Sequence, residues 1–314
     1  MNKTAFVFPG QGAQYAGMGR EFYDNFKESR EIFERANEAL GFDISKLCFE
    51  GPTEDLSITK ITQPALLTVC MAIYEVLKKS QNSSVVMGGL SLGEYSALTA
   101  AGAMDFETAV KLVYKRGNYM QNAVPLGEGG MLALLGCSAD DAIAFCEEIT
   151  AKYGLLEPAN FNCPGQIVVG GKSQAIDNAI GKTKEFNIKR AVKLQVSAPF
   201  HTSMLKPAGN KLKEDLDKIK FKKPESNVIS NVDTEYYETD QVIADKLEKQ
   251  VYNPVRWEAC VRKMIADGVS TFVEIGPGKT LSAFIKKIDR NVKIINIENI
   301  QGLNTYLQLA GVSA

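Results

Sequence analysis

Short apolar runs along the chain alternate with longer stretches in which apolar residues recur at helical spacing. TAFVFPG (4–10) and SVVMGG (84–89) are short and end in Pro-Gly or Gly-Gly, so they predict buried strands. Amphipathic helices are expected from the first of these strands to about residue 80, and helical sequence resumes over 93–124. NVISNV (227–232) and STFVEIGPGKTL (270–281) predict further strands.

The pattern changes after Pro125, where the spacing of apolar residues predicts six short elements. They are a strand over 129–136, a helix over 138–154, strands over 156–162 and 166–171, a helix over 173–187 and a strand over 189–196. This β-α-β-β-α-β order is that of the ferredoxin-like split βαβ motif. The chain is therefore predicted to fold as an α/β-hydrolase-like domain with a mostly parallel sheet (1–125 and 196–314) and an inserted ferredoxin-like domain (126–195).

Composition and charge narrow the class of protein. The 314 residues are 45% hydrophobic and 23% charged, which is ordinary for a globular protein, and the net charge of −1 argues against a nucleic-acid partner. MNKTAFVFPGQG (1–12) has too short an apolar core for a signal peptide, and the apolar run at 65–77 is too short for a membrane span. We therefore expect a cytoplasmic protein with no membrane association.

The chain has six cysteines and one histidine, which are few ligands for a transition-metal site. The cysteines form no C-x-x-C pair and stand at positions 48, 70, 137, 146, 163 and 260. Their spacing suits neither a zinc site nor a disulfide framework. We expect reduced, structural thiols and no metal.

The segment Gly89-Leu90-Ser91-Leu92-Gly93 fits the G-x-S-x-G pattern of a nucleophilic serine on a sharp turn. It lies between a predicted strand and a predicted helix, which is the context that this motif requires. Glycines on both sides allow a strained turn, and the following helix directs its N-terminal amides at the site. Ser91 is therefore predicted to be a nucleophile rather than a small residue in a tight turn.

A serine nucleophile needs a base and donors for an oxyanion. Lys, Asp or Glu could serve, but histidine is the usual base, and His201 in SAPFHTSM is the one histidine in the chain. We expect it at a loop-to-helix junction. The amide of Leu92, which follows the nucleophile, and the amide of Gln11, in the glycine-rich loop FPGQGAQ (8–14), are the expected oxyanion donors. A phosphate-binding role for this loop is less favoured because no G-K-[ST] follows.

Nine motifs, in this order and spread over nearly the whole chain, resemble the malonyl-CoA:acyl carrier protein transacylase family, the acyltransferases of fatty acid and polyketide synthesis. The motifs are FPGQGAQ (8–14), TQPAL (62–66), GLSLGEYSAL (89–98), Arg116-Gly117, NFNCPGQIVVGG (160–171), PFH (199–201), SNVD (230–233), QVYNPVRW (250–257) and EIGPGKTL (274–281).

The resemblance implies a malonyl transfer from malonyl-CoA to acyl carrier protein, with no permanently bound cofactor. Ser91 would take the acyl group, and His201 would be the base, oriented by a backbone carbonyl near Gln250. The guanidinium of Arg116 would pair with the free carboxylate of malonate, which its fork of donors matches bidentately.

Other positions are interpreted through the same resemblance. Asn160 and Gln166 are expected to line the substrate cleft, and the ring of Phe200 to leave little room for an α-methyl group on the acyl chain. Leu90 is a departure, since the family commonly has histidine before the nucleophile. We infer that a histidine there is dispensable and tunes packing or polarity behind the serine.

The implied partner is acidic, so a basic docking surface is expected. Two groups are candidates: Lys189, Arg190 and Lys193, and Lys286, Lys287 and Arg290. Three alternatives stay open at this point. They are a serine thioesterase or other hydrolase with an acidic third member, a stand-alone acyltransferase of a polyketide synthase, and a non-catalytic relative.

Overall fold

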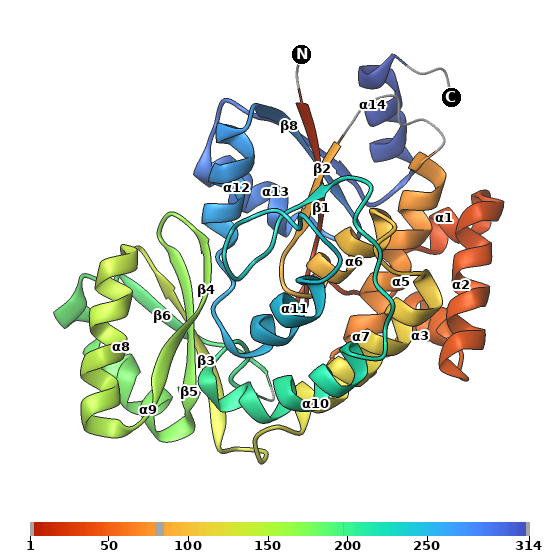
Figure 1. The fold of residues 1–314 in the computed structure, drawn as a ribbon. Helices are drawn as coiled ribbons and strands as arrows, with labels where there is room; N and C mark the ends of the chain where they lie inside the picture. The colour runs from red at the N-terminus through yellow and green to blue at the C-terminus, as the bar shows by residue number, and fades with distance from the viewer. Residues whose placement is uncertain (1–2, 79–84, 197, 312–314) are drawn as a thin grey trace.

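A parallel sheet of five strands forms the centre of the larger part of the molecule, within the residues that the computed structural model describes, 3–78, 85–196 and 198–311 (Figure 1). All four neighbouring pairs run parallel, so the mostly parallel sheet predicted from the sequence is confirmed. In their order across the sheet, the strands are β7 (Asn227–Val228), β2 (Val85–Gly89), β1 (Lys3–Phe8), β8 (Val269–Ile275) and β9 (Lys293–Ile297).

Helices cover both faces of this sheet. Successive side chains of a strand point to opposite faces, so Phe6 and Phe8 of β1 enter one apolar cluster while Ala5 and Val7 enter another. The second cluster is completed by α12 (Trp257–Ala266) and α13 (Thr280–Ile288). The first takes residues from α1 (Arg20–Asn25), α2 (Lys27–Leu40), α3 (Ile44–Glu50), α4 (Thr53–Leu56), α5 (Thr59–Lys78), α6 (Leu92–Ala100), α7 (Phe106–Gln121), α10 (Lys206–Leu216), α11 (Ile243–Tyr252) and α14 (Ile300–Ala310).

A smaller antiparallel sheet lies beside the larger part, in green in Figure 1. In order across the sheet its strands are β4 (Leu156–Cys163), β5 (Gln166–Lys172), β3 (Gly129–Leu135) and β6 (Arg190–Lys193). Leu132 and Leu134 of β3 pack on α8 (Ala139–Tyr153) and α9 (Ser173–Ala179). Met131 and Ala133, on the opposite face of β3, belong instead to the main core. The small sheet is therefore covered by helices on one face and turns its other face to the larger part.

The two sheets are joined by main-chain hydrogen bonds as well as by the chain itself. The amide of Phe161 in β4 donates to the carbonyl of Val255 over 2.9 Å, and the amide of Val255 donates to the carbonyl of Ala159 over 2.9 Å. Val255 lies just before α12, in the larger part. One edge of the small sheet is thus fixed to a segment that is almost a hundred residues away along the chain.

Several predicted elements are shorter than expected. The strand predicted over 227–232 is limited to β7, because the chain turns at Ser230, whose carbonyl accepts from the amide of Thr234. The helix predicted over 173–187 continues after α9 as the 3₁₀ helix η1 (Ile180–Phe186). The last strand of the small sheet ends at Lys193. Ser84, in the predicted second strand, and Ser197, in the predicted loop before His201, lie outside the described residues, as do the ends of the predicted large domain.

Helix α5 shows why length alone is a poor test for a membrane span. Within the described residues it is the one helix that is long and apolar enough to cross a membrane, and the length argument made from residues 65–77 was therefore wrong. About four fifths of its apolar window (78%) is nevertheless buried against the rest of the protein. Its apolar character is explained by its place in the main core.

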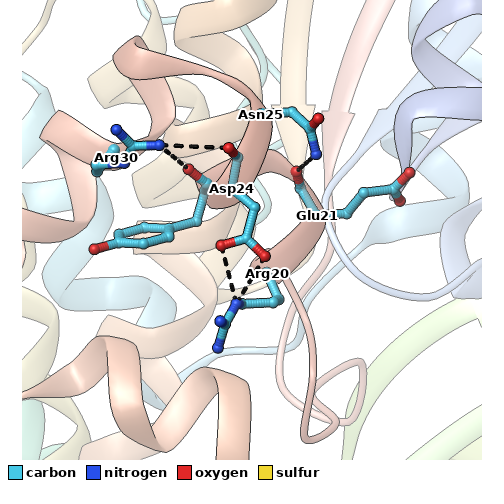
Figure 2. A network of polar contacts seen from close by, with 6 residues as sticks. Arg20, Glu21, Asp24, Asn25 and Arg30 are labelled. Atoms are coloured by element: carbon cyan, nitrogen blue, oxygen red, sulfur yellow. Dashed lines mark hydrogen bonds and ion pairs between the residues drawn. The ribbon is translucent and has the colours of Figure 1, made fainter.

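The corner between α1 and α2 is held by side chains that bond to main-chain carbonyls (Figure 2). Arg30 of α2 donates to the carbonyls of Tyr23 and Asp24, which lie at the end of α1 and have no partner within that short helix. Within α1 itself, the side-chain amide of Asn25 donates to the carbonyl of Glu21. This corner brings α2 against α5 in the main core.

Candidate active site

Ser91 stands on a strained turn between the end of β2 and the start of α6. Its φ of 55° and ψ of −101° are unfavourable for a residue with a side chain. A Cβ atom at Gly89 would lie 2.1 Å from the carbonyl carbon of Gly93, and one at Gly93 would lie 2.0 Å from the carbonyl oxygen of Phe8. Both flanking glycines are therefore required by close main-chain contacts, and the predicted elbow geometry is what the structure contains.

The side chain of Asn231 braces this turn. Its Oδ1 accepts from the amide of Ser91 over 2.7 Å, and its Nδ2 donates to the carbonyl of Gly89 over 2.8 Å. Asn231 is fully buried. Sequence reasoning missed this role, although a polar residue inside the apolar pattern of 227–232 was a usable signal.

His201 lies directly against the serine. Its Nε2 is 2.8 Å from Ser91 Oγ, and its Nδ1 is 2.7 Å from the carbonyl oxygen of Gln250. A carbonyl oxygen can only accept, so Nδ1 carries the proton and Nε2 is free to accept the serine proton. Burial, and then the neighbouring charge of Arg116, lower the pKa of His201 to about 3. The imidazole is therefore neutral near pH 7, as a general base must be.

The main chain at His201 differs from the prediction. Its φ is 59°, and the residue lies in a turn. The 3₁₀ turn η2 (Ser203–Leu205) follows, and α10 begins at Lys206. The expectation that a helix begins at His201 was wrong by five residues, because the chain bends here to bring the ring over Ser91.

Arg116 of α7 is buried beside the serine without a carboxylate partner. Its Nη1 donates to Gln63 Oε1 over 2.8 Å, and its Nη2 donates to Gln250 Oε1 over 2.9 Å and to Ser91 Oγ over 3.1 Å. Its Nε is buried and has no hydrogen-bond partner among the described residues. Burial lowers the pKa of Arg116, but a guanidinium stays charged at neutral pH. An unpaired buried cation is costly, so an anionic ligand is expected here.

A buried carboxylate lies on the other side of Gln250. Both oxygens of Glu94 accept hydrogen bonds: Oε1 from the hydroxyl of Tyr237 over 2.5 Å, and Oε2 from Gln250 Nε2 over 2.5 Å and from the amide of Asn231 over 3.1 Å. Burial raises the pKa of Glu94 to about 7. Neither Glu94 nor Gln63 was singled out from the sequence, because a helical Glu or Gln carries no local pattern that marks it as buried.

A cavity of about 260 Å³ opens in front of these groups, between the two sheets. Gln11 and Leu92 line it, and in the described part of the chain neither amide N–H has an acceptor, so both are available to a ligand. Asn160, Gln166 and Phe200 also line it, as the sequence led us to expect. The structure thus brings every predicted site residue to one place, although Gln250 contributes a side chain as well as the predicted carbonyl.

Leu90 lines the same cavity and packs against the apolar cluster of α12 and α13. It is partly exposed and makes the wall behind the serine apolar. The cavity also takes Leu281 and Phe284 from α13. This wall therefore offers contact to apolar parts of a ligand and carries no second imidazole.

An elbow serine, a neutral imidazole and two unpaired amides are suited to forming an acyl-serine, with the oxyanion held by the amides. This arrangement on a parallel α/β sheet defines a class of acyl-transferring enzymes that work through a serine. The chain belongs to the acyl transferase domain family, whose model matches residues 5–304.

Individual relatives agree over almost their full lengths. The malonyl CoA-acyl carrier protein transacylase of Bacillus subtilis (strain 168) is 45% identical over 308 residues, 98% of this chain and 97% of the relative. The crystal structure of the transacylase of that name from Clostridium perfringens has a TM-score of 0.93 at 49% identity and covers 98% and 96% of the two chains. A malonyl-transacylase in complex with its type II polyketide synthase acyl-carrier protein has a TM-score of 0.95 at 38% identity and covers 98% and 100%.

Proposed function

We propose that the protein transfers a malonyl group from malonyl-CoA to the phosphopantetheine thiol of acyl carrier protein, through a malonyl-Ser91 intermediate, and so supplies extender units for fatty acid synthesis. The observation that carries the malonyl specificity is the buried guanidinium of Arg116, which lies 3.1 Å from the nucleophile and has no carboxylate partner among the described residues. A malonyl group ends in a carboxylate two bonds from its thioester carbonyl. Arg116 can therefore hold the acyl group that Ser91 attacks.

In the first half of the proposed reaction, Ser91 Oγ attacks the thioester carbonyl while His201 Nε2 takes its proton, and coenzyme A leaves as the thiol after His201 returns that proton. In the second half, His201 deprotonates the phosphopantetheine thiol, which attacks malonyl-Ser91. The carbonyl of Gln250 keeps Nδ1 protonated throughout and stabilises the imidazolium that forms in each half. The amides of Gln11 and Leu92 hold the oxyanion.

The cavity walls are proposed to favour transfer over hydrolysis. Asn160 and Gln166 lie on the small-sheet side of the cavity, and Phe200 precedes the base. Phe200 is mostly buried and restricts the space for an α-substituent on the acyl group. A filled cavity excludes water from the acyl-serine until the second thiol arrives.

The finer description of the fold is part of this proposal. We propose that residues 1–125 and 196–314 form an α/β-hydrolase-like domain and that residues 126–195 form a ferredoxin-like insert. The chain order β3-α8-β4-β5-α9-β6 and the sheet order β4-β5-β3-β6 support the second description. A cytoplasmic location is proposed as well, because the apolar helix α5 is buried within the protein.

The carrier protein is proposed to dock at the mouth of the cavity, because each basic group has one member close in sequence to a residue that lines the cavity. Lys193 adjoins the cavity residue Leu194, and Lys286 follows Phe284 by two residues. Lys193 forms an ion pair with Asp177, which leaves less of its charge for a partner. The exposed group on and after α13, Lys286, Lys287 and Arg290, has no ion pair among the described residues and is the stronger candidate.

A thioesterase or other hydrolase is not favoured. Such an enzyme normally orients its histidine with an acidic residue, whereas His201 Nδ1 faces a main-chain carbonyl. The relatives reported above are named as transacylases, and a hydrolase has no use for an unpaired Arg116 beside the serine. Service to a polyketide synthase is not favoured, because the relative whose description mentions such a synthase is 38% identical to this chain, whereas the Bacillus subtilis relative, whose name mentions none, is 45% identical.

Brief exposure of the protein to malonyl-CoA, followed by intact-protein mass measurement, tests the proposal. We expect a malonyl adduct that is absent in Ser91→Ala and that moves to holo acyl carrier protein when this is added. Ser96→Ala is a matched control, since Ser96 lies in α6, the helix that follows Ser91, but does not line the cavity. An adduct that persists in Ser91→Ala, or no adduct on the wild-type protein, would refute the proposal. Release of free malonate without a carrier would indicate a hydrolase.

A further inference from the structure

Glu94 takes no direct part in the proposed reaction, yet it is a fully buried carboxylate one helical turn from the nucleophile. Buried carboxylates without a cation in contact are costly, so the three donors that point at Glu94 need an explanation. Two of them, the amide of Asn231 and the hydroxyl of Tyr237, belong to the segment that braces the elbow turn. The third, Gln250 Nε2, belongs to the residue that contacts both His201 and Arg116.

The side-chain amide of Gln250 has a donating NH₂ group and an accepting oxygen, so its orientation decides which of the two faces Arg116. Its Nε2 donates to Glu94 Oε2 and to the carbonyl of Ser91, while its Oε1 accepts from Arg116 Nη2. If the amide were reversed, its NH₂ group would face the guanidinium, donor against donor, and its oxygen would face the oxygens of Glu94 and Ser91. The acceptors on the Nε2 side therefore decide that an oxygen faces Arg116.

We propose that Glu94 is a positioning residue that acts through Gln250 to hold the guanidinium of Arg116 beside Ser91. This inference rests on the proposed malonyl transfer. The carboxyl oxygen of Glu94 accepts from one end of the Gln250 amide and Arg116 donates to the other, so both partners polarise the amide in the same direction. A direct ion pair would fill the guanidinium donors that the substrate carboxylate needs. The glutamine between them keeps Arg116 in place and keeps it available.

The test compares malonyl and acetyl loading of Ser91 from the two coenzyme A thioesters, measured as second-order rate constants by intact mass. In Glu94→Ala one of the two acceptors of Gln250 Nε2 is lost, and only the carbonyl of Ser91 still fixes the orientation of the amide on that side. We expect the malonyl-to-acetyl ratio to fall by about tenfold, since the hydrogen bond from Arg116 to Gln250 involves a charged group. In Glu94→Gln the new oxygen must face the fixed amide of Asn231, and it then also accepts from Gln250. That variant should keep the ratio within about threefold of wild type.

Two further variants distinguish a positioning role of Glu94 from a general loss of stability. Tyr237→Phe removes a different partner of Glu94 and leaves Oε2 on Gln250, so it should lower stability without changing the ratio. If Glu94→Ala does not fold, Gln250→Met takes its place, because it keeps the main-chain carbonyl for His201 but removes the amide oxygen from Arg116. The same fall in the ratio is expected.

A parallel loss of malonyl and acetyl loading in Glu94→Ala, or in Gln250→Met, would overturn the inference and leave Glu94 with a structural role. So would a fall in the ratio in Tyr237→Phe as large as in Glu94→Ala. The proposed function is refuted by a different result, namely that the wild-type protein forms no malonyl adduct on Ser91.

Discussion

Replacing Arg116 with alanine removes the cation that lies 3.1 Å from Ser91 Oγ, and the effect should depend on the acyl group. A malonyl carboxylate held by two charge-assisted hydrogen bonds loses both, each worth about 1.5–3 kcal/mol. Taking the lower value for each gives about 3 kcal/mol, which lowers the second-order rate constant for malonyl loading on the order of 100-fold. An acetyl group has no carboxylate and loses neither bond.

Acetyl loading in Arg116→Ala should be retained or improved. The charge of Arg116 is the second-largest cause of the low pKa of His201, so its removal raises that pKa and makes the imidazole a stronger base. The variant also leaves the oxygens of Gln63 and Gln250 without a donor, which costs about 1–3 kcal/mol of folding free energy each. Part of this cost is offset, because the variant no longer buries the charge of the guanidinium.

The assay is intact-mass measurement of the acyl-enzyme over time with each thioester, with thermal unfolding recorded on the same samples. Arg262→Ala is a suitable control, because it removes an exposed arginine of α12 that does not line the cavity. A fall by the same factor for malonyl and acetyl, in a variant that remains folded, would refute the carboxylate role of Arg116.

Two further predictions concern the elbow and the base. Gly93→Ala places a Cβ 2.0 Å from the carbonyl of Phe8, so we expect it to abolish loading and to lower the free energy of unfolding by about 1–3 kcal/mol or more, as seen by thermal unfolding. Gly181→Ala, which meets no atom within 4 Å, is its control, and equal behaviour of the two variants contradicts the close contact. The folded pKa of His201, about 3, lies below the ordinary value of 6.5, so its contribution to stability is present above pH 6.5 and is lost as the pH falls toward 3. His201→Gln should therefore remove about 1.4 kcal/mol per pH unit from the acid slope of unfolding free energy in this range, measured by denaturant titration, and an unchanged slope argues against a buried neutral imidazole.

Local signals predicted the parts of the site that the main chain builds. Gly89 and Gly93 mark two positions where close main-chain contacts leave no room for a side chain. This requirement can be recognised from five consecutive residues of the sequence. His201 was found by elimination, since no other histidine exists in the chain. The sheet was predicted for a similar reason, because buried parallel strands appear as short apolar runs.

Long-range polar contacts could not be predicted in this way. Glu94 and Gln250 lie 156 positions apart in the sequence, and Ser91 and Asn231 lie 140 apart. A glutamine or glutamate in a helix is usually exposed, and nothing in its neighbours marks it as part of a buried network. β9 and α14 were not predicted either, although KIINI of β9 is a short apolar run of the kind that marked the other strands.

The hydrogen bonds between β4 and Val255 bear on how the cavity can change shape. If only the two chain crossings joined the small sheet to the larger part, the small sheet and its helices could rotate as a body about the line through the crossings. The main-chain bonds of Ala159 and Phe161 to Val255 add a third attachment. A rotation of the small sheet against the larger part would strain these hydrogen bonds, so they oppose changes in the width of the cavity between the two sheets. We therefore expect the cavity to keep much the same width with and without a ligand.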